Sequence, residues 1–281
     1  MSYVNHVDVT AIVACFSFAE GATLPISVIS WGEITDSGSG GRAMVDLELD
    51  DDVATITIDR PHACNAIALD TMEQLEKALD GAEGARVLVI TGAGERAFVA
   101  GGDLRSLASV RTETEAAAMT WRMRSIYDRI AGFPCPTVAA LNGHTLGGGS
   151  ELAVSADIRI AADDIKIGFN QVKLEIMPGW GGAERLAALI GPSRALLLAG
   201  TGRMLDAVEA ERIGLIDQIV PRESFHETWR SIARSLAARP VADIKRVIAG
   251  VPATQAVAAF ARLWTTDEHW QAADKVLKRR S

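Results

Sequence analysis

Three consecutive glycines, Gly147, Gly148 and Gly149, stand where a strand-like segment (136–141) gives way to a helix-like segment (151–156). The first N–H groups of a helix have no partner within the helix and carry a partial positive charge. The junction is therefore a ready site for an anion, or for an oxygen that becomes negative during a reaction. Glycine-rich turns also exist purely for tight packing, so the turn alone leaves both interpretations open. A P-loop is excluded, because no Gly-Lys-Ser/Thr follows.

Two further features favour a reaction at this turn. Glu151 follows Gly148 by three residues, a spacing that returns a helical side chain to the same face. A second glycine-bearing turn, with Gly101 and Gly102, also follows an extended segment. Two backbone N–H donors from two turns are what a thioester oxygen needs when it becomes an enolate. The pattern does not show whether the two turns meet in space.

The order of predicted elements defines the class and the organisation of the chain. Strands and helices alternate from residue 44 onward, which predicts an α/β fold. Residues 1–43 lack lysine and contain a turn-rich run, so we interpret them as an atypical N-terminal extension, ordered only in part. It is either the product of an upstream start, with Met44 as the natural one, or a short docking strand. We expect a core over 44–235 and a helical C-terminal region over 236–281.

Composition excludes several classes of function. The net charge of -8 argues against nucleic-acid or anionic-membrane partners, which require basic patches. The apolar run over 10–19 is too short to span a bilayer. The 3 cysteines are scattered without metal-ligand spacing, and we expect no metal site and a cytoplasmic protein. The match to G-x-G-x-x-A at 92–97 is rejected as a nucleotide site, because no helix begins within it.

Four segments, 60–66, 98–104, 142–152 and 177–182, resemble in order and spacing the enoyl-CoA hydratase/isomerase (crotonase) superfamily. The resemblance covers about residues 44–281. It implies an α/β spiral of ββα units with a helical C-terminal trimerisation region. It also implies an acyl-CoA substrate, no cofactor beyond the coenzyme A of that substrate, and a homotrimer or a hexamer of two trimers.

The resemblance also implies roles for individual residues. The N–H groups of Gly102 and Gly148 would hold the thioester oxygen, and Glu151 would match the first of two catalytic glutamates in hydratases. Seven residues on two segments would border the coenzyme A: His62, Ala63, Cys64, Ala66, Ala100, Asp103 and Leu104.

The sequence departs from the family at Gln171, where hydratases carry the second glutamate. A glutamine amide orients water but does not exchange a proton near neutral pH. Glu175, four residues later, replaces the missing carboxylate if the local chain is helical, although we favour a surface carboxylate. For His144 we favour a packed or solvated loop residue over a proton-transfer group. A nucleophilic pair of Ser150 with His144 is disfavoured, because no orienting acid is evident.

Three functions therefore remain. The first is hydration of trans-2-enoyl-CoA, with Glu151 as acid and base and Gln171 positioning water. The second is another reaction of the superfamily, either decarboxylation of a malonyl-type CoA, which needs one later proton donor, or double-bond isomerisation, whose base is usually at the position of Gln171. The third is acyl-CoA binding without catalysis.

Overall fold

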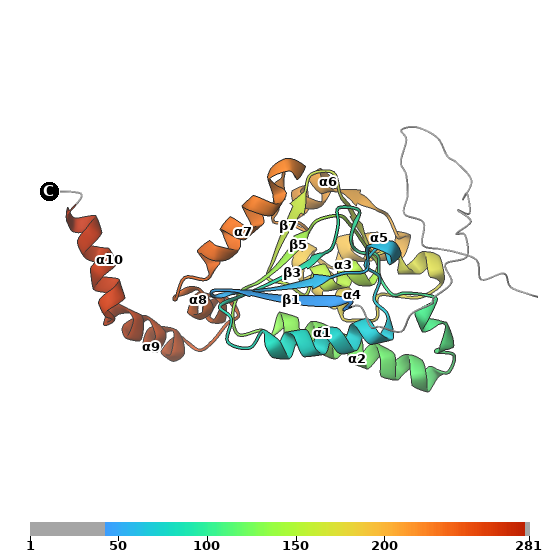
Figure 1. Cartoon of the computed structure of the whole chain (residues 1–281), viewed down its shortest axis with the longest axis horizontal. Coiled ribbons are helices and arrows are strands. Elements are labelled where there is room, and N and C mark those ends of the chain that lie inside the picture. The colour runs from blue at the N-terminus through green and yellow to red at the C-terminus, as the bar shows by residue number, and fades with distance from the viewer. Residues whose placement is uncertain (1–42, 279–281) are drawn as a thin grey trace, which may run out of the picture.

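The computed structural model describes residues 43–278 of the chain. The predicted N-terminal extension, apart from Ala43, lies outside the described residues. Figure 1 shows a layered α/β body with a helical arm that carries the C-terminus.

The larger sheet has six strands in the order β1-β2-β3-β5-β7-β10. The alternating apolar residues of 45–49 and 53–58 predict a hairpin, and the first pair of strands is indeed antiparallel, while every later neighbour is parallel. Buried parallel strands read as continuous apolar runs, because both faces are covered; β3 and β5 are buried along their whole length. The strands are β1 (Val45–Asp50), β2 (Val53–Ile58), β3 (Val87–Gly92), β5 (Thr137–Leu141), β7 (Ile158–Ala162) and β10 (Gln218–Val220).

A smaller sheet has the order β4-β6-β8-β9. Its strands are β4 (Ala97–Val99), β6 (His144–Leu146), β8 (Lys166–Gly168) and β9 (Leu205–Asp206). In each of the pairs β3/β4, β5/β6 and β7/β8, the first strand joins the large sheet and the second joins the small one. This repeated ββα winding is the spiral that the resemblance to the crotonase superfamily implies.

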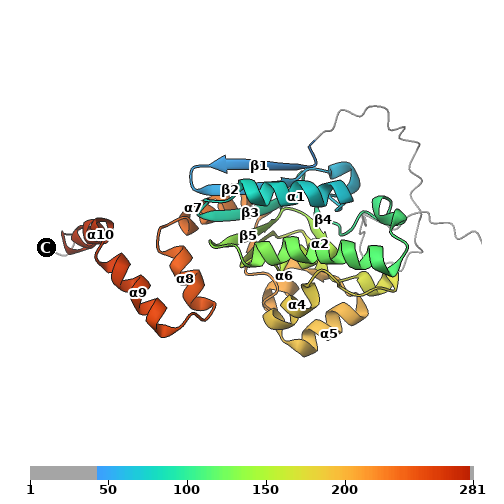
Figure 2. The same cartoon turned by 90° about the horizontal axis from the view of Figure 1, so that it is seen from below.

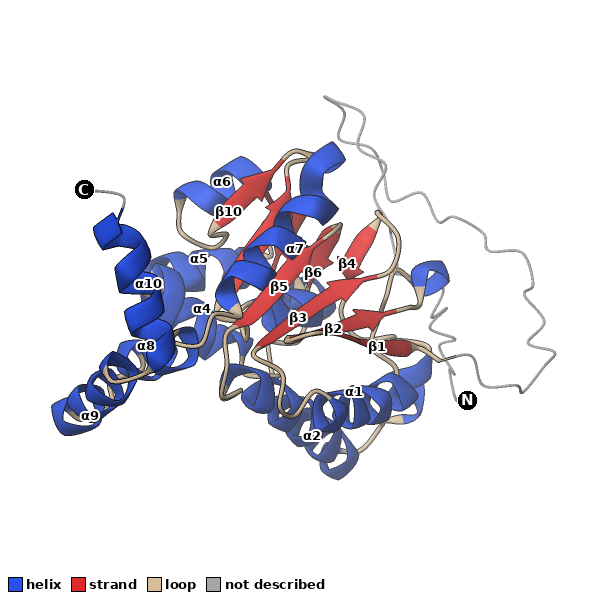
Figure 3. Ribbon diagram, turned by 60° about the vertical axis from the view of Figure 1, so that its left-hand side comes forward, coloured by secondary structure: helices blue, strands red, loops and turns tan. Residues whose placement is uncertain are grey.

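Helices cover both faces of the large sheet (Figure 3). On one side α1 (Leu69–Gly81) packs on β1 and β2 and against α2 (Glu113–Ala131), and on the other α7 (Phe225–Leu236) crosses β3 and β7. The sequence has apolar residues at helical spacing in both segments, which predicts two apolar stripes, and these face inward with Leu75 of α1 and Ile126 of α2 buried. The remaining helices of the body are α3 (Gly148–Ala153), α4 (Gly182–Ile190), α5 (Pro192–Thr201) and α6 (Ala207–Arg212), with short 3-10 turns at η1 (Pro61–Ala63), η2 (Ser106–Ser109), η3 (Gln171–Leu174) and η4 (Arg222–Ser224).

The last three helices form an arm that leads away from the body (Figure 2). They are α8 (Val241–Ile248), α9 (Ala253–Trp264) and α10 (Asp267–Lys278), and none of them contains a buried residue. From residue 193 onward the sequence pattern predicts helices and one strand near 216–220, where the structure has β10. The structure adds β9, whose two residues are too few to leave a periodic pattern. Nowhere in residues 43–278 is there a helix with the length and apolar character needed to cross a bilayer.

Candidate active site

Three turns follow three neighbouring parallel strands of the small sheet. Gly102 follows β4, Gly148 follows β6 and Gln171 follows β8. The carboxyl ends of parallel strands lie at one edge of a sheet, which is where open α/β sheets bind ligands. The sheet order β4-β6-β8 therefore brings together residues that are separated by about seventy positions in the sequence.

The two glycine turns are in direct contact. A Cβ placed on Gly101 would lie 3.3 Å from the backbone nitrogen of Gly148, and the φ of Gly101 is +97°, a conformation that favours glycine. Gly148 is the first residue of α3, so its N–H has no partner within the helix. The bridge between Ile67 and the Gly101–Gly102 turn uses the Gly101 carbonyl and the Asp103 N–H, and no backbone carbonyl of the described residues accepts from the Gly102 N–H. Both predicted donors thus belong to one small site.

Glu151 lies on α3, one turn after Gly148, and is only 2% exposed. Its Oε2 accepts hydrogen bonds from the backbone N–H groups of Trp180 at 2.7 Å and Gly182 at 2.9 Å, while Oε1 accepts from Gln171 Nε2 at 2.9 Å. Gly182 begins α4, and a Cβ there would lie 2.2 Å from Glu151 Cγ. Glycine is therefore required for the carboxylate to reach this helix N-terminus.

Burial dominates the electrostatics of Glu151. Removal from water disfavours the charged carboxylate and raises its pKa, and the hydrogen bonds from Gly182, Trp180 and Gln171 oppose that rise only in part. The resulting pKa is about 7. A carboxyl group with this pKa both accepts and donates protons near neutral pH, as an acid–base catalyst must.

Gln171 lies beside Glu151, but only half of its amide is satisfied. The Nε2 group donates to Glu151, whereas Oε1 is buried and has no hydrogen-bond partner among residues 43–278. A buried acceptor without a partner is costly, so this oxygen requires an explanation. It lies next to the Glu151 carboxyl and can accept a hydrogen bond from a molecule bound there.

Tyr127 supports the site in a way the sequence reasoning missed. Its side chain is fully buried on α2, and its hydroxyl donates to the carbonyl of Gly148 at 2.9 Å. Burial raises the pKa of this phenol well above its ordinary value, so the hydroxyl stays protonated. The available signal was a tyrosine within an apolar helical stripe, because a buried tyrosine usually needs a partner for its hydroxyl.

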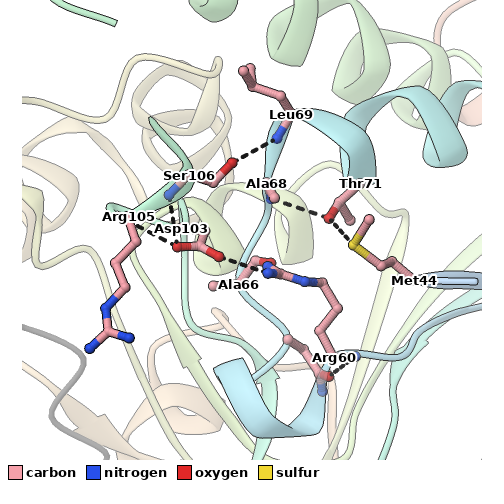
Figure 4. Close-up of polar contacts among 10 residues, drawn as sticks. Met44, Arg60, Ala66, Ala68, Leu69, Thr71, Asp103, Arg105 and Ser106 are labelled. Carbon is pink, nitrogen blue, oxygen red and sulfur yellow. Dashed lines mark hydrogen bonds and ion pairs between the residues drawn. The ribbon is translucent and has the colours of Figure 1, made fainter. Parts of the chain in front are cut away.

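The residues expected to border coenzyme A form one continuous strip. The backbone N–H of Ala100 donates to the Cys64 carbonyl at 3.1 Å, which joins the segment 62–66 to the segment 100–104. Arg60 adds an ion pair with Asp103 at 2.8 Å and a hydrogen bond to the Ala66 carbonyl (Figure 4). Burial opposes ionisation of Asp103, but hydrogen bonds from Arg60 and the backbone outweigh it and lower the pKa of the carboxyl. Among the seven residues, His62 and Leu104 are exposed and Cys64 and Ala66 are buried.

The other titratable candidates do not join this centre. His144 is half-buried, and its Nδ1 accepts from the Lys166 N–H at 3.0 Å, while burial lowers the pKa of the ring. The hydroxyl of Ser150 is bonded to the carbonyls of Thr145 and Gly168, so no pair with His144 forms. Glu175 is exposed at the end of η3 with φ +57° and is not a partner of Glu151. The surface interpretation of Glu175 is confirmed.

Comparison with known proteins shows the family to which the chain belongs. The profile of the enoyl-CoA hydratase/isomerase family matches residues 48–270. A probable enoyl-CoA hydratase of Mycobacterium bovis is 38% identical over 68% of this chain and 74% of its own. A short-chain-enoyl-CoA hydratase of Clostridium acetobutylicum is 37% identical over 71% of this chain and 77% of its own. The chain belongs to the enoyl-CoA hydratase/isomerase family.

Solved structures show the same architecture. An enoyl-CoA hydratase from Bacillus anthracis superposes with a TM-score of 0.77 at 30% identity, over 84% of this chain and 97% of that one. One from Thermoplasma volcanium gives a TM-score of 0.74 at 35% identity, over 83% and 96%. The crotonase-like spiral is therefore confirmed.

Proposed function

We propose that this protein is an enoyl-CoA hydratase that adds water across the 2,3 double bond of a trans-2-enoyl-CoA. The observation that carries this proposal is a buried Glu151, with a pKa of about 7, beside two glycine turns whose N–H groups are available to an oxyanion. The names of the similar proteins from Mycobacterium and Clostridium support the same reaction.

One carboxylate performs both proton transfers in this proposal. Ionised Glu151 takes a proton from water as the water oxygen bonds to C3 of the substrate. The electron pair of the double bond moves through C2 to the thioester oxygen, and the Gly102 and Gly148 N–H groups stabilise the resulting enolate. Protonated Glu151 then returns the proton to C2, and the enolate collapses to the 3-hydroxyacyl thioester. One water is consumed, and the carboxylate is regenerated.

Gln171 positions the water in this scheme. Its buried Oε1 accepts a hydrogen bond from the water hydrogen that is not transferred to Glu151. This gives the otherwise unpartnered oxygen a hydrogen-bond donor. Its Nε2 keeps the carboxylate oriented toward the same water. The strip that joins 62–66 to 100–104 binds the coenzyme A. Because Gly102 belongs to the second of these segments, the thioester group attached to the coenzyme A lies within reach of the Gly102 N–H.

The test is a spectroscopic assay with purified protein. We expect loss of the conjugated thioester absorbance of crotonyl-CoA, and a 3-hydroxybutyryl-CoA product identified by mass spectrometry. Gln171→Glu runs in parallel, and a rise in kcat would mean that a single carboxylate limits the rate. Absence of hydration contradicts the proposal. Parallel incubations with methylmalonyl-CoA and with a 3-enoyl-CoA then report decarboxylation and isomerisation, and binding without turnover supports a carrier role.

The pH dependence of hydration follows from the pKa of Glu151. The carboxyl must be ionised to accept the first proton, so activity is expected to be full above pH 7 and to fall as the pH drops below it. At pH 6 about a tenth of the carboxyl is ionised, so kcat/KM is expected to be about tenfold lower than at pH 8. The measurement is kcat/KM for crotonyl-CoA between pH 5.5 and 9. A flat profile over this range contradicts the assignment of Glu151 as the base.

We also propose that the C-terminal arm binds further copies of the chain. Helices α8–α10 contain no buried residue, yet one face is apolar and aromatic. Trp264 stacks with Phe260 at 5.6 Å and contacts Trp270 at 5.7 Å, and all three remain about half exposed or more. Apolar surface of this extent on an isolated arm indicates a protein interface.

The expected assembly is a homotrimer or a hexamer of two trimers. Analytical ultracentrifugation is expected to give three or six times the chain mass of 29.9 kDa. Phe260→Asp combined with Trp264→Asp places charge in the apolar face and is expected to lower that mass. A wild-type monomer at micromolar concentration would contradict the proposal.

A further inference from the structure

The indole ring of Trp180 lies against both glycine turns of the site. A Cβ placed on Gly148 would be 2.2 Å from Trp180 Cζ3, and one placed on Gly102 would be 3.4 Å from Trp180 Cη2. No methyl group fits between Gly148 and the ring, since real Cβ contacts essentially never fall below about 3 Å. The six-membered part of the indole is therefore a wall shared by the two oxyanion donors.

This wall is fixed in place. Trp180 is 8% exposed, and its ring makes an edge contact with Tyr127, at 6.0 Å between centroids and 78° between planes. Tyr127 is itself fully buried and bonded to Gly148. The backbone N–H of Trp180 is held by Glu151 at 2.7 Å. A ring clamped at its edge and at its backbone does not swing aside at low cost.

The position of the wall limits the substrate. C1 of the acyl group must lie at the N–H groups of Gly102 and Gly148, and C2 and C3 must lie within reach of Glu151. The ring packs against Gly148 and lies near Gly102, and the Trp180 backbone N–H holds Glu151, so the ring borders the space for these first carbons. An acyl chain that continues beyond them meets a rigid planar side chain. Leu107 narrows the same place, because its Cδ1 would be 2.9 Å from a Cβ on Gly102.

We propose that Trp180 is a specificity-determining residue that closes the acyl pocket and restricts this protein to short-chain 2-enoyl thioesters of about four carbons. The proposal rests on the function proposed above and gives it a substrate class. One methylene group in an apolar pocket changes kcat/KM by roughly 10- to 200-fold, so a closed pocket produces a steep chain-length profile.

The test compares chain lengths in wild type, Trp180→Phe and Trp180→Ala. With crotonyl-CoA, hexenoyl-CoA and decenoyl-CoA, wild-type kcat/KM is expected to fall at least a hundredfold from the first to the last. Trp180→Ala is expected to raise the decenoyl-to-crotonyl ratio at least tenfold, with Trp180→Phe between the two. Trp121→Ala, which removes an exposed tryptophan of α2, is the matched control and should leave the ratio unchanged. Parallel profiles in wild type and Trp180→Ala would overturn the proposal.

Binding separates this inference from the hydratase assignment. Saturated butyryl-CoA and decanoyl-CoA are not hydrated, and calorimetry measures their Kd for each variant directly. If wild type hydrates no enoyl-CoA, the proposed reaction fails, but a tenfold or larger gain in decanoyl-CoA affinity in Trp180→Ala still supports the wall. If the wild type hydrates enoyl-CoA and the ratio of the decanoyl-CoA and butyryl-CoA affinities does not change in Trp180→Ala, the specificity role of Trp180 is contradicted and the proposed reaction stands. Thermal unfolding confirms that each variant is folded.

Discussion

Glu151→Gln is expected to lower kcat/KM for crotonyl-CoA hydration by about 10³- to 10⁴-fold, at the upper end of the range for loss of a general acid–base. The expected loss is large because the same carboxylate accepts the first proton and donates it in the second step. No second carboxylate lies among its hydrogen-bond partners, which are Trp180, Gly182 and Gln171. Steady-state kinetics at pH 8 measure the effect.

The free energy of unfolding of Glu151→Gln shows whether a loss of activity comes from the missing carboxylate or from unfolding of the variant. The folded-state pKa of Glu151, about 7, lies above its ordinary value of 4.5, so the fold favours the protonated form. Ionising the buried group therefore destabilises the native state as the pH rises, by roughly 3 kcal/mol once the pH exceeds 7. Glu151→Gln removes that cost, so its stability relative to wild type is expected to be higher at pH 8 than at pH 5.

A matched substitution completes the comparison. Glu175→Gln makes the same chemical change at an exposed position only a few residues beyond Gln171. Its kcat/KM is expected to stay within about twofold of wild type, as for surface substitutions that remove no buried contact. Substantial residual hydration in Glu151→Gln, together with a large loss in Glu175→Gln, would move the acid–base role to the surface carboxylate.

The sequence predicted the parts of the site that depend on local spacing. The strand–glycine–helix order placed the Gly148 N–H and Glu151 one helical turn apart, and the structure has them on α3. Apolar periodicity likewise predicted the hairpin and the buried faces of α1 and α2. These features follow from contacts between residues a few positions apart, which a periodic pattern records.

Other parts depend on contacts that no local pattern records. The strands β4, β6 and β8 have three residues each, too short for an alternating signature, yet their pairing makes the two glycine turns converge. Trp180 and Gly182 meet Glu151 across about thirty residues of sequence, and that contact sets both its geometry and its pKa. The sequence showed the turn at 177–182 as part of a resemblance, but not what the turn does.

Gly148→Ala is expected to lower kcat by about 10²- to 10³-fold, close to the effect of removing an oxyanion donor, although the substitution keeps the N–H. The three atoms nearest to the added Cβ all belong to the Trp180 ring, at 2.2 to 3.1 Å. The buried ring of Tyr127 makes an edge contact with the indole and opposes its displacement. The backbone of Gly148 must move instead, and its N–H then points away from the substrate oxygen. Steady-state kinetics and thermal unfolding measure both consequences.

Rescue by a second substitution tests this cause. Because the three atoms nearest to the new methyl group all belong to the ring, Gly148→Ala combined with Trp180→Ala is expected to be at least tenfold more active than Gly148→Ala alone, a coupling that a double-mutant cycle isolates. Gly149→Ala is the control, since its Cβ would lie 1.9 Å from the Val99 carbonyl oxygen, which no side-chain truncation removes. Trp180→Ala is therefore expected to rescue Gly148→Ala and to leave Gly149→Ala destabilised. Equal activity of the single and double variants at position 148 would show that the ring does not confine the oxyanion turn.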